Sequence, residues 1–191
     1  MTAPITYIPD FVPDAAEAFT ALQTELNWEQ RDAPRQEYYC NDTPNPYVYG
    51  RGKGERLYNP QPYHPVILSI RAKLESLTGT VFDVCFLNRY LNQGMHLGWH
   101  SDNSPEMDDA RPIGVVSLGA EREIWFRLSE GANVAVEKLM LGHGSLVLMA
   151  PGMQDTHQHR IPKASFVCGE RVSLTFRGYV QPFNALDVTE D

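Results

Sequence analysis

The segment Arg171-Val172-Ser173-Leu174-Thr175-Phe176-Arg177 alternates polar and apolar side chains along its whole length. A period of two is typical of a β-strand that has one face in the core. We expect Val172, Leu174 and Phe176 to enter the core and the polar side chains to line the opposite face. Two inward-facing arginines are costly to bury unless an anion meets them. The segment therefore predicts a β-strand that carries an anion site.

Further strands are predicted from short apolar or alternating runs that turn residues separate. The predicted strands are 82–87, 112–118, 123–128, 134–141, 145–149 and 171–180. Several strands without intervening helices indicate an antiparallel sandwich or barrel. The predicted fold class is mainly β with flanking helices.

Two helices are predicted on the N-terminal side of these strands. The first begins after Pro13, with Asp14 as its N-cap and Glu17 as the capping-box partner. Its expected buried stripe is Ala15, Phe19, Leu22 and Leu26. The second spans 65–78 and ends at Gly79. Its expected buried face is Ile67, Ile70, Leu74 and Leu77.

Composition limits the classes of protein that the chain can represent. Its 191 residues, 42% of them hydrophobic, suit a single domain over 1–191. A net charge of −8 argues against coating duplex nucleic acid by charge alone. Three cysteines without a Cys-x-x-Cys spacing indicate neither a disulfide framework nor a zinc site. With no basic leader and no long apolar run, we expect a cytoplasmic protein without a membrane partner.

Candidate metal ligands gather in the segment His96-Leu97-Gly98-Trp99-His100-Ser101-Asp102. If this segment is extended, His100 and Asp102 share one face. Taken alone, it also suits a surface loop with incidental histidines. A further histidine and the two arginines near the C-terminus favour a two-His-one-carboxylate Fe(II) site with a dicarboxylate held by guanidinium groups. The third ligand could be any of three histidines, His143, His157 or His159.

Four motifs together carry a family resemblance. They are Asn88-Arg89-Tyr90, His96-x-Gly98-x-His100-x-Asp102, His143-Gly144-Ser145 and the strand 171–177. With these motifs the chain resembles AlkB-type Fe(II)/2-oxoglutarate-dependent dioxygenases, a family of nucleic-acid demethylases. The resemblance is strongest over 82–179, about half of the chain. It implies a double-stranded β-helix (jelly roll) with its catalytic core at 82–181.

The resemblance also implies roles for single residues. Fe(II) would be bound by His100, Asp102 and His159, with His157 as the alternative to His159. The residues implied for 2-oxoglutarate are Asn88, Tyr90, Arg171, Ser173 and Arg177, with Arg171 on the remote carboxylate. Ser173 stands where the family usually has asparagine. O2 would be the third reactant.

The remaining histidines have simpler expectations. We expect His143 in a turn between two strands and His64 in a loop. For His96 we expect a role in lining the pocket or supporting the metal ligands, with backbone hydrogen bonding as an equal alternative.

The segment 31–63 differs from the rest of the chain. It is rich in proline, glycine and tyrosine, so we expect short hairpins and no helix. Tyrosines next to basic residues can stack on bases and neutralise phosphates. In AlkB-like enzymes this position holds a lid that recognises the substrate nucleotide. Tyr49, Arg51 and Tyr58 are therefore candidate substrate contacts, although each tyrosine is equally suited to packing on the rim of the fold.

Substrate choice is the least determined property. Ser104 stands where close relatives often have an acidic residue that reads the base, and Glu106 or Asn103 could replace it. We expect oxidative demethylation of N-alkylated bases in single-stranded nucleic acid, DNA rather than RNA, by a monomer. On an N-methyl group, hydroxylation ends in release of formaldehyde. The alternatives are a hydroxylase or demethylase of a protein side chain or small molecule, and a binding module with an inactive site.

Overall fold

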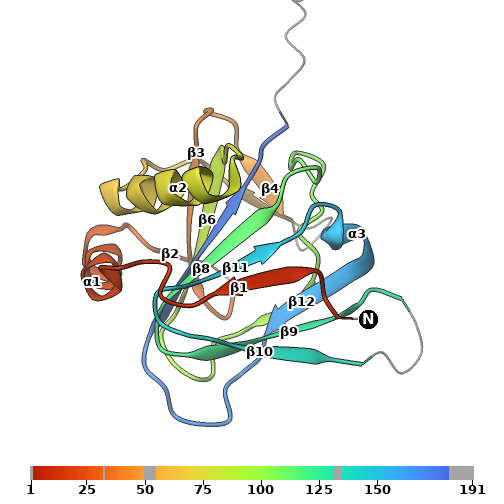
Figure 1. The fold of residues 1–191 in the computed structure, drawn as a ribbon. Coiled ribbons are helices and arrows are strands. Elements are labelled where there is room, and N and C mark those ends of the chain that lie inside the picture. The colour runs from red at the N-terminus through yellow and green to blue at the C-terminus, as the bar shows by residue number, and fades with distance from the viewer. Residues whose placement is uncertain (1, 32, 50–54, 131–134, 181–191) are drawn as a thin grey trace, which may run out of the picture.

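A computed structural model describes residues 2–31, 33–49, 55–130 and 135–180 of the chain. Strands dominate it, and helices flank them (Figure 1). Its elements are, in order, β1 (Ile5–Ile8), α1 (Ala15–Glu25), β2 (Glu29–Gln30), β3 (Gln36–Asn41), β4 (Tyr47–Tyr49), β5 (Arg56–Tyr58), α2 (Pro65–Thr78), β6 (Val84–Tyr90), β7 (Leu97–His100), β8 (Ile113–Gly119), β9 (Arg122–Leu128), β10 (Glu137–Leu141), β11 (Ser145–Met149), α3 (Met153–Thr156), β12 (His157–Ile161) and β13 (Arg171–Arg177).

The strands form two main sheets that pack face to face. The larger sheet has the order β1-β11-β8-β13-β6-β3-β2, and the smaller one has the order β10-β9-β12-β7. Apolar side chains from both sheets meet in one buried cluster, for example Val115 and Val147 with Ile124 and Phe126. In Figure 1 the strands β9, β10 and β12 lie as a layer below β1, β8 and β11. The predicted antiparallel sandwich is confirmed.

Strand β13 lies at the centre of the larger sheet, between β6 and β8. Ser173 is the cross-strand partner of both Asn88 on β6 and Ser117 on β8. Arg171 likewise pairs with Tyr90 on β6. Because side chains alternate along a strand, these polar residues face the smaller sheet while their neighbours face away from it.

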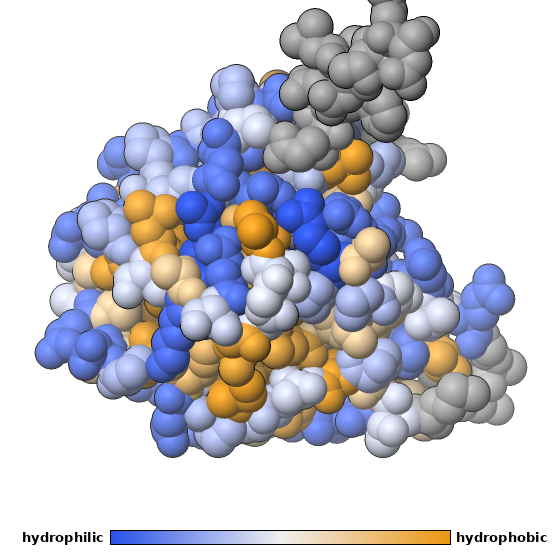
Figure 2. All heavy atoms as spheres, turned by 45° about the horizontal axis from the view of Figure 1, so that its top comes forward, coloured by the Kyte–Doolittle hydropathy of each residue, from blue (hydrophilic) through white to orange (hydrophobic). Residues whose placement is uncertain are grey.

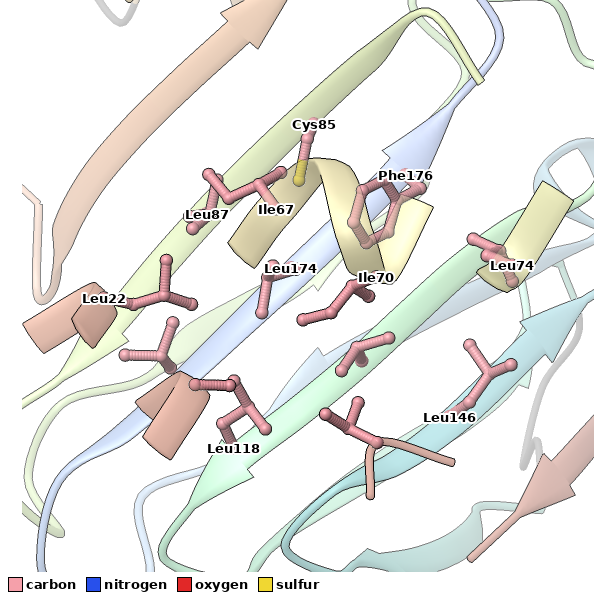
Figure 3. Packing of buried hydrophobic residues seen from close by; sticks show 14 of the residues in the cluster. Leu22, Ile67, Ile70, Leu74, Cys85, Leu87, Leu118, Leu146, Leu174 and Phe176 are labelled. Carbon is pink, nitrogen blue, oxygen red and sulfur yellow. The ribbon is translucent and has the colours of Figure 1, made fainter. Parts of the chain in front are cut away.

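The opposite face of the larger sheet is covered by α1 and α2. Leu22 from α1 and Ile67, Ile70 and Leu74 from α2 pack onto the sheet, as Figure 3 shows. The sheet contributes the apolar members of the alternating strand to this cluster, Val172, Leu174 and Phe176. The predicted direction of these three side chains is confirmed.

The ends of the helices differ from the prediction in two details. Asp14 occupies the N-cap of α1, but its side chain makes no capping hydrogen bond. His64 lies in the loop before α2, as predicted, and it also serves as the N-cap of α2, because its Nδ1 accepts a hydrogen bond from the Val66 amide at 3.2 Å. Leu77 is 50% exposed, so the buried face of α2 ends one turn early at Leu74. Gly79 ends α2 as predicted, with a φ of 66°.

Some elements were not predicted from the sequence. Strand β1 pairs with β11 at the edge of the larger sheet, although its residues show no clear alternation. Segment 31–63 forms β3 and the β4-β5 hairpin, which agrees with the expected hairpins.

Hydrophilic residues interrupt the hydrophobic groups on the face that carries α2 (Figure 2).

The cysteines agree with the expectation that no disulfide is present. Cys40 and Cys85 are cross-strand partners on β3 and β6, yet both are free thiols. Burial raises the pKa of Cys40 to about 12, so this thiol is protonated and unreactive at neutral pH.

Among the described residues, no helix has the length and the apolar run that crossing a membrane requires.

Candidate metal centre and co-substrate pocket

Three side chains from the smaller sheet converge inside the sandwich. His100 ends β7, Asp102 follows it, and His159 lies on β12 directly opposite His100. The Nε2 atom of His100 is 3.7 Å from Asp102 Oδ1, and the Nε2 atom of His159 is 3.8 Å from Asp102 Oδ2. One donor atom from each residue lies within 4.8 Å of the others. A single ion can therefore contact all three, which leaves its remaining coordination positions open on one side.

One histidine presents the ring nitrogen that a metal requires, and the other has the required charge state. His100 Nδ1 donates a hydrogen bond to the Gly98 carbonyl at 2.8 Å, so the lone pair of Nε2 points at the site. Burial, helped by the nearby His100 ring, lowers the pKa of His159 to about 3. His159 is thus a neutral imidazole at physiological pH, the form that binds metal ions.

Asp102 is held as a carboxylate in this enclosed position. Burial alone would raise its pKa, but the Arg177 guanidinium, together with His159 and His100, outweighs burial and lowers the pKa. Arg177 also donates a hydrogen bond to the Asp102 carbonyl, and the Asp102 amide donates to Gln154 Oε1 at 3.0 Å. These contacts fix the carboxylate between the two imidazoles.

The alternative ligands lie elsewhere. His157 is buried on the same face of β12, but its Nδ1 is 2.8 Å from Thr156 Oγ1 and it is not a member of the three-residue group. His143 lies in the turn between β10 and β11, as predicted, and its Nδ1 accepts a hydrogen bond from the Gly119 amide at 2.8 Å. The structure therefore brings His159, and neither of these two residues, to His100 and Asp102.

Arg171 forms the inner wall of the same pocket. Its exposed fraction is 0%, and its Nε donates a hydrogen bond to Ser117 Oγ at 2.8 Å. Within the described part of the chain, its Nη1 and Nη2 atoms have no partner. Burial, and to a lesser extent Arg122, lowers the pKa of Arg171 to about 10, so the guanidinium remains charged at neutral pH. A buried cation with two unpartnered donor atoms is suited to binding an anion.

The other residues predicted for 2-oxoglutarate line the same pocket. They are Asn88, Tyr90, Ser173 and Arg177. The Tyr90 hydroxyl is buried close enough to Arg171 to influence its pKa, and within the described ranges it has no well-formed hydrogen bond, so it is a second group available to a polar ligand.

Arg35 is a pocket residue that sequence reasoning missed. This buried side chain precedes β3, where its Nε donates to Asn88 Oδ1 at 2.6 Å. It also forms an ion pair with the fully buried Glu37 at 2.7 Å. The only sequence signal was an arginine and an acid two residues apart, which places them on one face of a strand. That spacing is too common to identify a site.

The tyrosines of the β4-β5 hairpin form the pocket opening. Tyr47, Tyr49 and Tyr58 all line it. Tyr58 is only 2% exposed, and its hydroxyl donates to Glu37 Oε2 at 2.8 Å. It is thus a buried wall residue and not an exposed stacking platform. Tyr49 is half-buried and retains an accessible face, whereas Arg51 lies outside the described residues.

Two of the expected substrate contacts are placed outside the pocket. His96 lies against Gly94, with its Nδ1 3.2 Å from that carbonyl oxygen, and it does not line the metal pocket. The alternative, a histidine that bonds to the backbone, describes it better. Glu106 also does not line the pocket. Its carboxylate lies near Tyr179, where burial of the hydroxyl, and to a lesser extent the charge of Glu106, raises the pKa of Tyr179. Ser104 contacts the opening instead, since its Oγ is 2.7 Å from the Tyr47 hydroxyl.

Fold and site together define a double-stranded β-helix with a two-His-one-carboxylate metal centre beside an anion pocket. Comparison with known proteins leads to the same class. The family model of the 2OG-Fe(II) oxygenase superfamily matches residues 4–177. This chain therefore belongs to the 2OG-Fe(II) oxygenase superfamily.

Individual relatives agree with this assignment. The chain is 37% identical to human DNA oxidative demethylase ALKBH2 over 182 residues, which cover 86% of this chain and 68% of the relative. It is 32% identical to human alpha-ketoglutarate-dependent dioxygenase alkB homolog 3 over 187 residues, which cover 88% of this chain and 64% of the relative. The solved structure of OsALKBH1 has the same fold, with a TM-score of 0.62 at 18% identity over 93% of this chain and 99% of that one.

Proposed function

We propose that this protein uses Fe(II), 2-oxoglutarate and O2 to demethylate N-alkylated bases in nucleic acid, with DNA as the preferred substrate. The single observation that carries the proposal is one pocket in which the triad His100, Asp102 and His159 faces the unpartnered Arg171 guanidinium. Two imidazoles and a carboxylate are the donor set that suits non-haem Fe(II). The free donors of Arg171 and Tyr90 suit a dicarboxylate co-substrate.

The metal and co-substrate, when bound, supply the oxidising chemistry that hydroxylates a C–H bond. The protein's residues then have defined tasks. Arg171 and Arg177 are positioned to bind the two ends of 2-oxoglutarate, and Asn88 and Tyr90 to orient it by hydrogen bonds. Buried side chains such as Ile124 and Val115 line the pocket and keep bulk water from the reacting atoms.

A methylated base is the substrate class that suits the pocket opening. Tyr49 lines the opening with an accessible face, and an aromatic face matches a planar base by stacking. The name of the human relative ALKBH2, a DNA oxidative demethylase, supports the same class and favours DNA over RNA. In this reading the segment 31–63 recognises the substrate and the segment 82–181 carries out the reaction.

Single-stranded substrate should be preferred over duplex. Extracting a base from a duplex costs a few kcal/mol, which proteins commonly offset with phosphate contacts. A chain with a net charge of −8 can offer such contacts only where its cations gather locally. We further propose that the protein acts as a monomer in the cytoplasm, where a reducing environment would keep its thiols free.

A second candidate function is hydroxylation or demethylation of a protein side chain or small molecule. It is favoured by Ser104, whose hydroxyl is engaged with Tyr47 and which offers no carboxylate to read a base. Formaldehyde release should be compared between methylated single-stranded DNA, RNA, duplex DNA and methylated peptides, with Fe(II) and 2-oxoglutarate present. Turnover only on peptides or small molecules would replace the first proposal with the second.

A further inference from the structure

The outer face of the smaller sheet carries cationic side chains interleaved with indole rings. The Arg127 guanidinium lies 4.3 Å from the centroid of the Trp99 ring. The Arg160 guanidinium lies between two rings, 4.7 Å from Trp99 and 4.1 Å from Trp125. The Lys138 ammonium lies 4.1 Å from Trp125. We call these five residues the cation–indole face.

The strand register explains why they are contiguous. Trp125 on β9 has Arg160 of β12 as its partner on one side and Lys138 of β10 on the other. Trp99 lies on β7, the edge strand next to β12. The cation–indole face therefore crosses all four strands of the smaller sheet. Because His159 points inward and Arg160 follows it, this face lies on the opposite side of the sheet from the metal centre.

The cations of this face lack the acidic partners that most other arginines have. Elsewhere in the described chain Arg31, Arg71, Arg89 and Arg111 each form an ion pair. Within the described ranges, no carboxylate lies within ion-pair distance of Arg127, Lys138 or Arg160. Three unpaired cations side by side are unusual on a chain with a net charge of −8. Their mutual repulsion would be relieved by an anionic ligand.

The cation–indole face continues into a groove that also contains cations and an aromatic ring. Trp125, Lys138 and Arg160 form one side of this groove, and Lys163 and Phe166 from the segment after β12 form the other. Lys163 and Phe166 are both exposed to solvent along this groove. Glu123 is the carboxylate in the groove, and it accepts a hydrogen bond from Trp125 Nε1 at 2.8 Å.

We propose that the cation–indole face and its groove bind a single-stranded stretch of the nucleic-acid substrate that extends beyond the catalytic pocket. This inference rests on the proposed function. Lys138, Arg160 and Lys163 contact phosphates, while the indole rings hold the cations in place and the exposed ring of Phe166 offers a face to unpaired bases. Alternating cations and aromatic rings are how proteins hold single strands without reading their sequence.

The edge strand β7 connects this surface to the active site. His100 points from β7 into the metal pocket, and the neighbouring Trp99 belongs to the outer face. A strand that leaves the pocket and passes the free edge of β7 would therefore meet Trp99 first. A duplex suits the surface less well, because its bases are already stacked on one another.

The first test measures binding, without catalysis. Anisotropy of a labelled, unmethylated single-stranded oligonucleotide of about 15 nucleotides gives Kd as a function of salt. For the double variant Lys138→Glu and Arg160→Glu we expect binding at least about tenfold weaker, with a salt slope smaller by about 2 because two phosphate contacts are lost. Lys73→Glu on α2 is the control, since a single charge reversal outside the face should change Kd far less.

The second test separates this surface from the catalytic pocket. With a methylated oligonucleotide of about 15 nucleotides, the double variant should raise KM and leave kcat unchanged. On a methylated trinucleotide, which is too short to reach the cation–indole face from the pocket, both constants should equal those of the wild type. Trp125→Ala tests whether the ring is needed to hold Lys138 and Arg160 in place, and Trp125→Phe should restore binding because it restores a ring under these cations.

Activity on the trinucleotide reveals folding defects, because a misfolded variant loses this activity as well. If the double variant misfolds, Arg160→Gln, which removes one charge without reversing it, replaces it. Unchanged Kd and salt slope in a variant that is active on the trinucleotide would overturn the inference. Equally weak binding of duplex and single strand to the wild type, or displacement of the oligonucleotide only by an acidic protein, would also overturn it. The proposed function fails separately, if no methylated nucleic acid of any length is demethylated.

Discussion

Replacing Arg171 with alanine should remove the main anchor of 2-oxoglutarate. In the structure the guanidinium is completely buried, one of its nitrogen atoms is held by Ser117 Oγ at 2.8 Å, and the other two have no partner in the described chain. Its fixed orientation leaves two donors for one carboxylate. The variant would leave that carboxylate buried and unmatched.

The expected loss can be worked out from this arrangement. Removing one partner of a buried, hydrogen-bonded charge pair costs about 2–5 kcal/mol. In Kd this corresponds to a loss of roughly thirtyfold to several thousandfold. Ser117→Ala removes only the neutral hydroxyl that orients Arg171, so its cost should be about 1 kcal/mol, or roughly fivefold.

Calorimetric titration with Mn²⁺ in place of Fe(II) measures this binding without turnover. The sharper comparison uses 2-oxopentanoate, which lacks the remote carboxylate of 2-oxoglutarate. The wild type should strongly prefer 2-oxoglutarate, whereas Arg171→Ala should bind both compounds about equally weakly. Arg71→Ala, which removes a surface arginine from α2, is the control for loss of a guanidinium elsewhere.

The reasoning is refuted if Arg171→Ala binds 2-oxoglutarate as the wild type does. If the preference over 2-oxopentanoate is lost in Arg177→Ala and kept in Arg171→Ala, the two arginines have exchanged roles.

Three further predictions concern the metal, the pH dependence and the pocket opening. His159→Ala should abolish iron-dependent succinate formation, whereas His157→Ala should retain most of it; the reverse pattern would show that the wrong histidine was chosen. The metal-free protein should lose stability as the pH falls from about 6.5 towards 3. The pKa of His159 is about 3 in the folded protein and near 6.5 in the unfolded chain, so only the unfolded chain gains a proton in this pH window. The slope should reach about 1.4 kcal/mol per pH unit in urea titrations, and an unchanged slope in His159→Gln would contradict this origin. Tyr49→Ala should weaken oligonucleotide binding by about 1–3 kcal/mol without changing uncoupled 2-oxoglutarate turnover, and wild-type oligonucleotide affinity in this variant would remove Tyr49 from the substrate contacts. Tyr58→Phe should mainly lower the free energy of unfolding, by about 1–3 kcal/mol, because it leaves the buried Glu37 carboxylate short of a donor.

Much of the fold could be predicted because its signals are local. The alternation of 171–177 determines which side chains enter the core, and the structure places Val172 and Phe176 there and Arg171 in the pocket. Glycine at position 79 ends α2 for the same local reason, since it readily adopts the left-handed conformation. The pairing of β1 with β11 could not be predicted, because it depends on contacts between residues about 140 positions apart.

The site was predictable in its ligands and less so in its walls. Spacing on one strand placed His157 and His159 on the same face, and only the register with β7 brings His159 opposite His100. Tyr58 was a candidate substrate contact, and its burial could not be predicted because its partner, Glu37, comes from a different strand. Arg35 and the position of His96 depend in the same way on tertiary contacts that no local pattern encodes.

The central claim is oxidative demethylation of a nucleic-acid base, and mass spectrometry of the product tests it most directly. A single-stranded DNA carrying one N1-methyladenine or N3-methylcytosine should be incubated with the protein, Fe(II), 2-oxoglutarate and O2, with Asp102→Ala as the inactive control. We predict that the oligonucleotide loses the mass of one methylene group per lesion, with stoichiometric formaldehyde and succinate, and that the control leaves it unchanged. Succinate formation while every methylated oligonucleotide keeps its mass would contradict the claim.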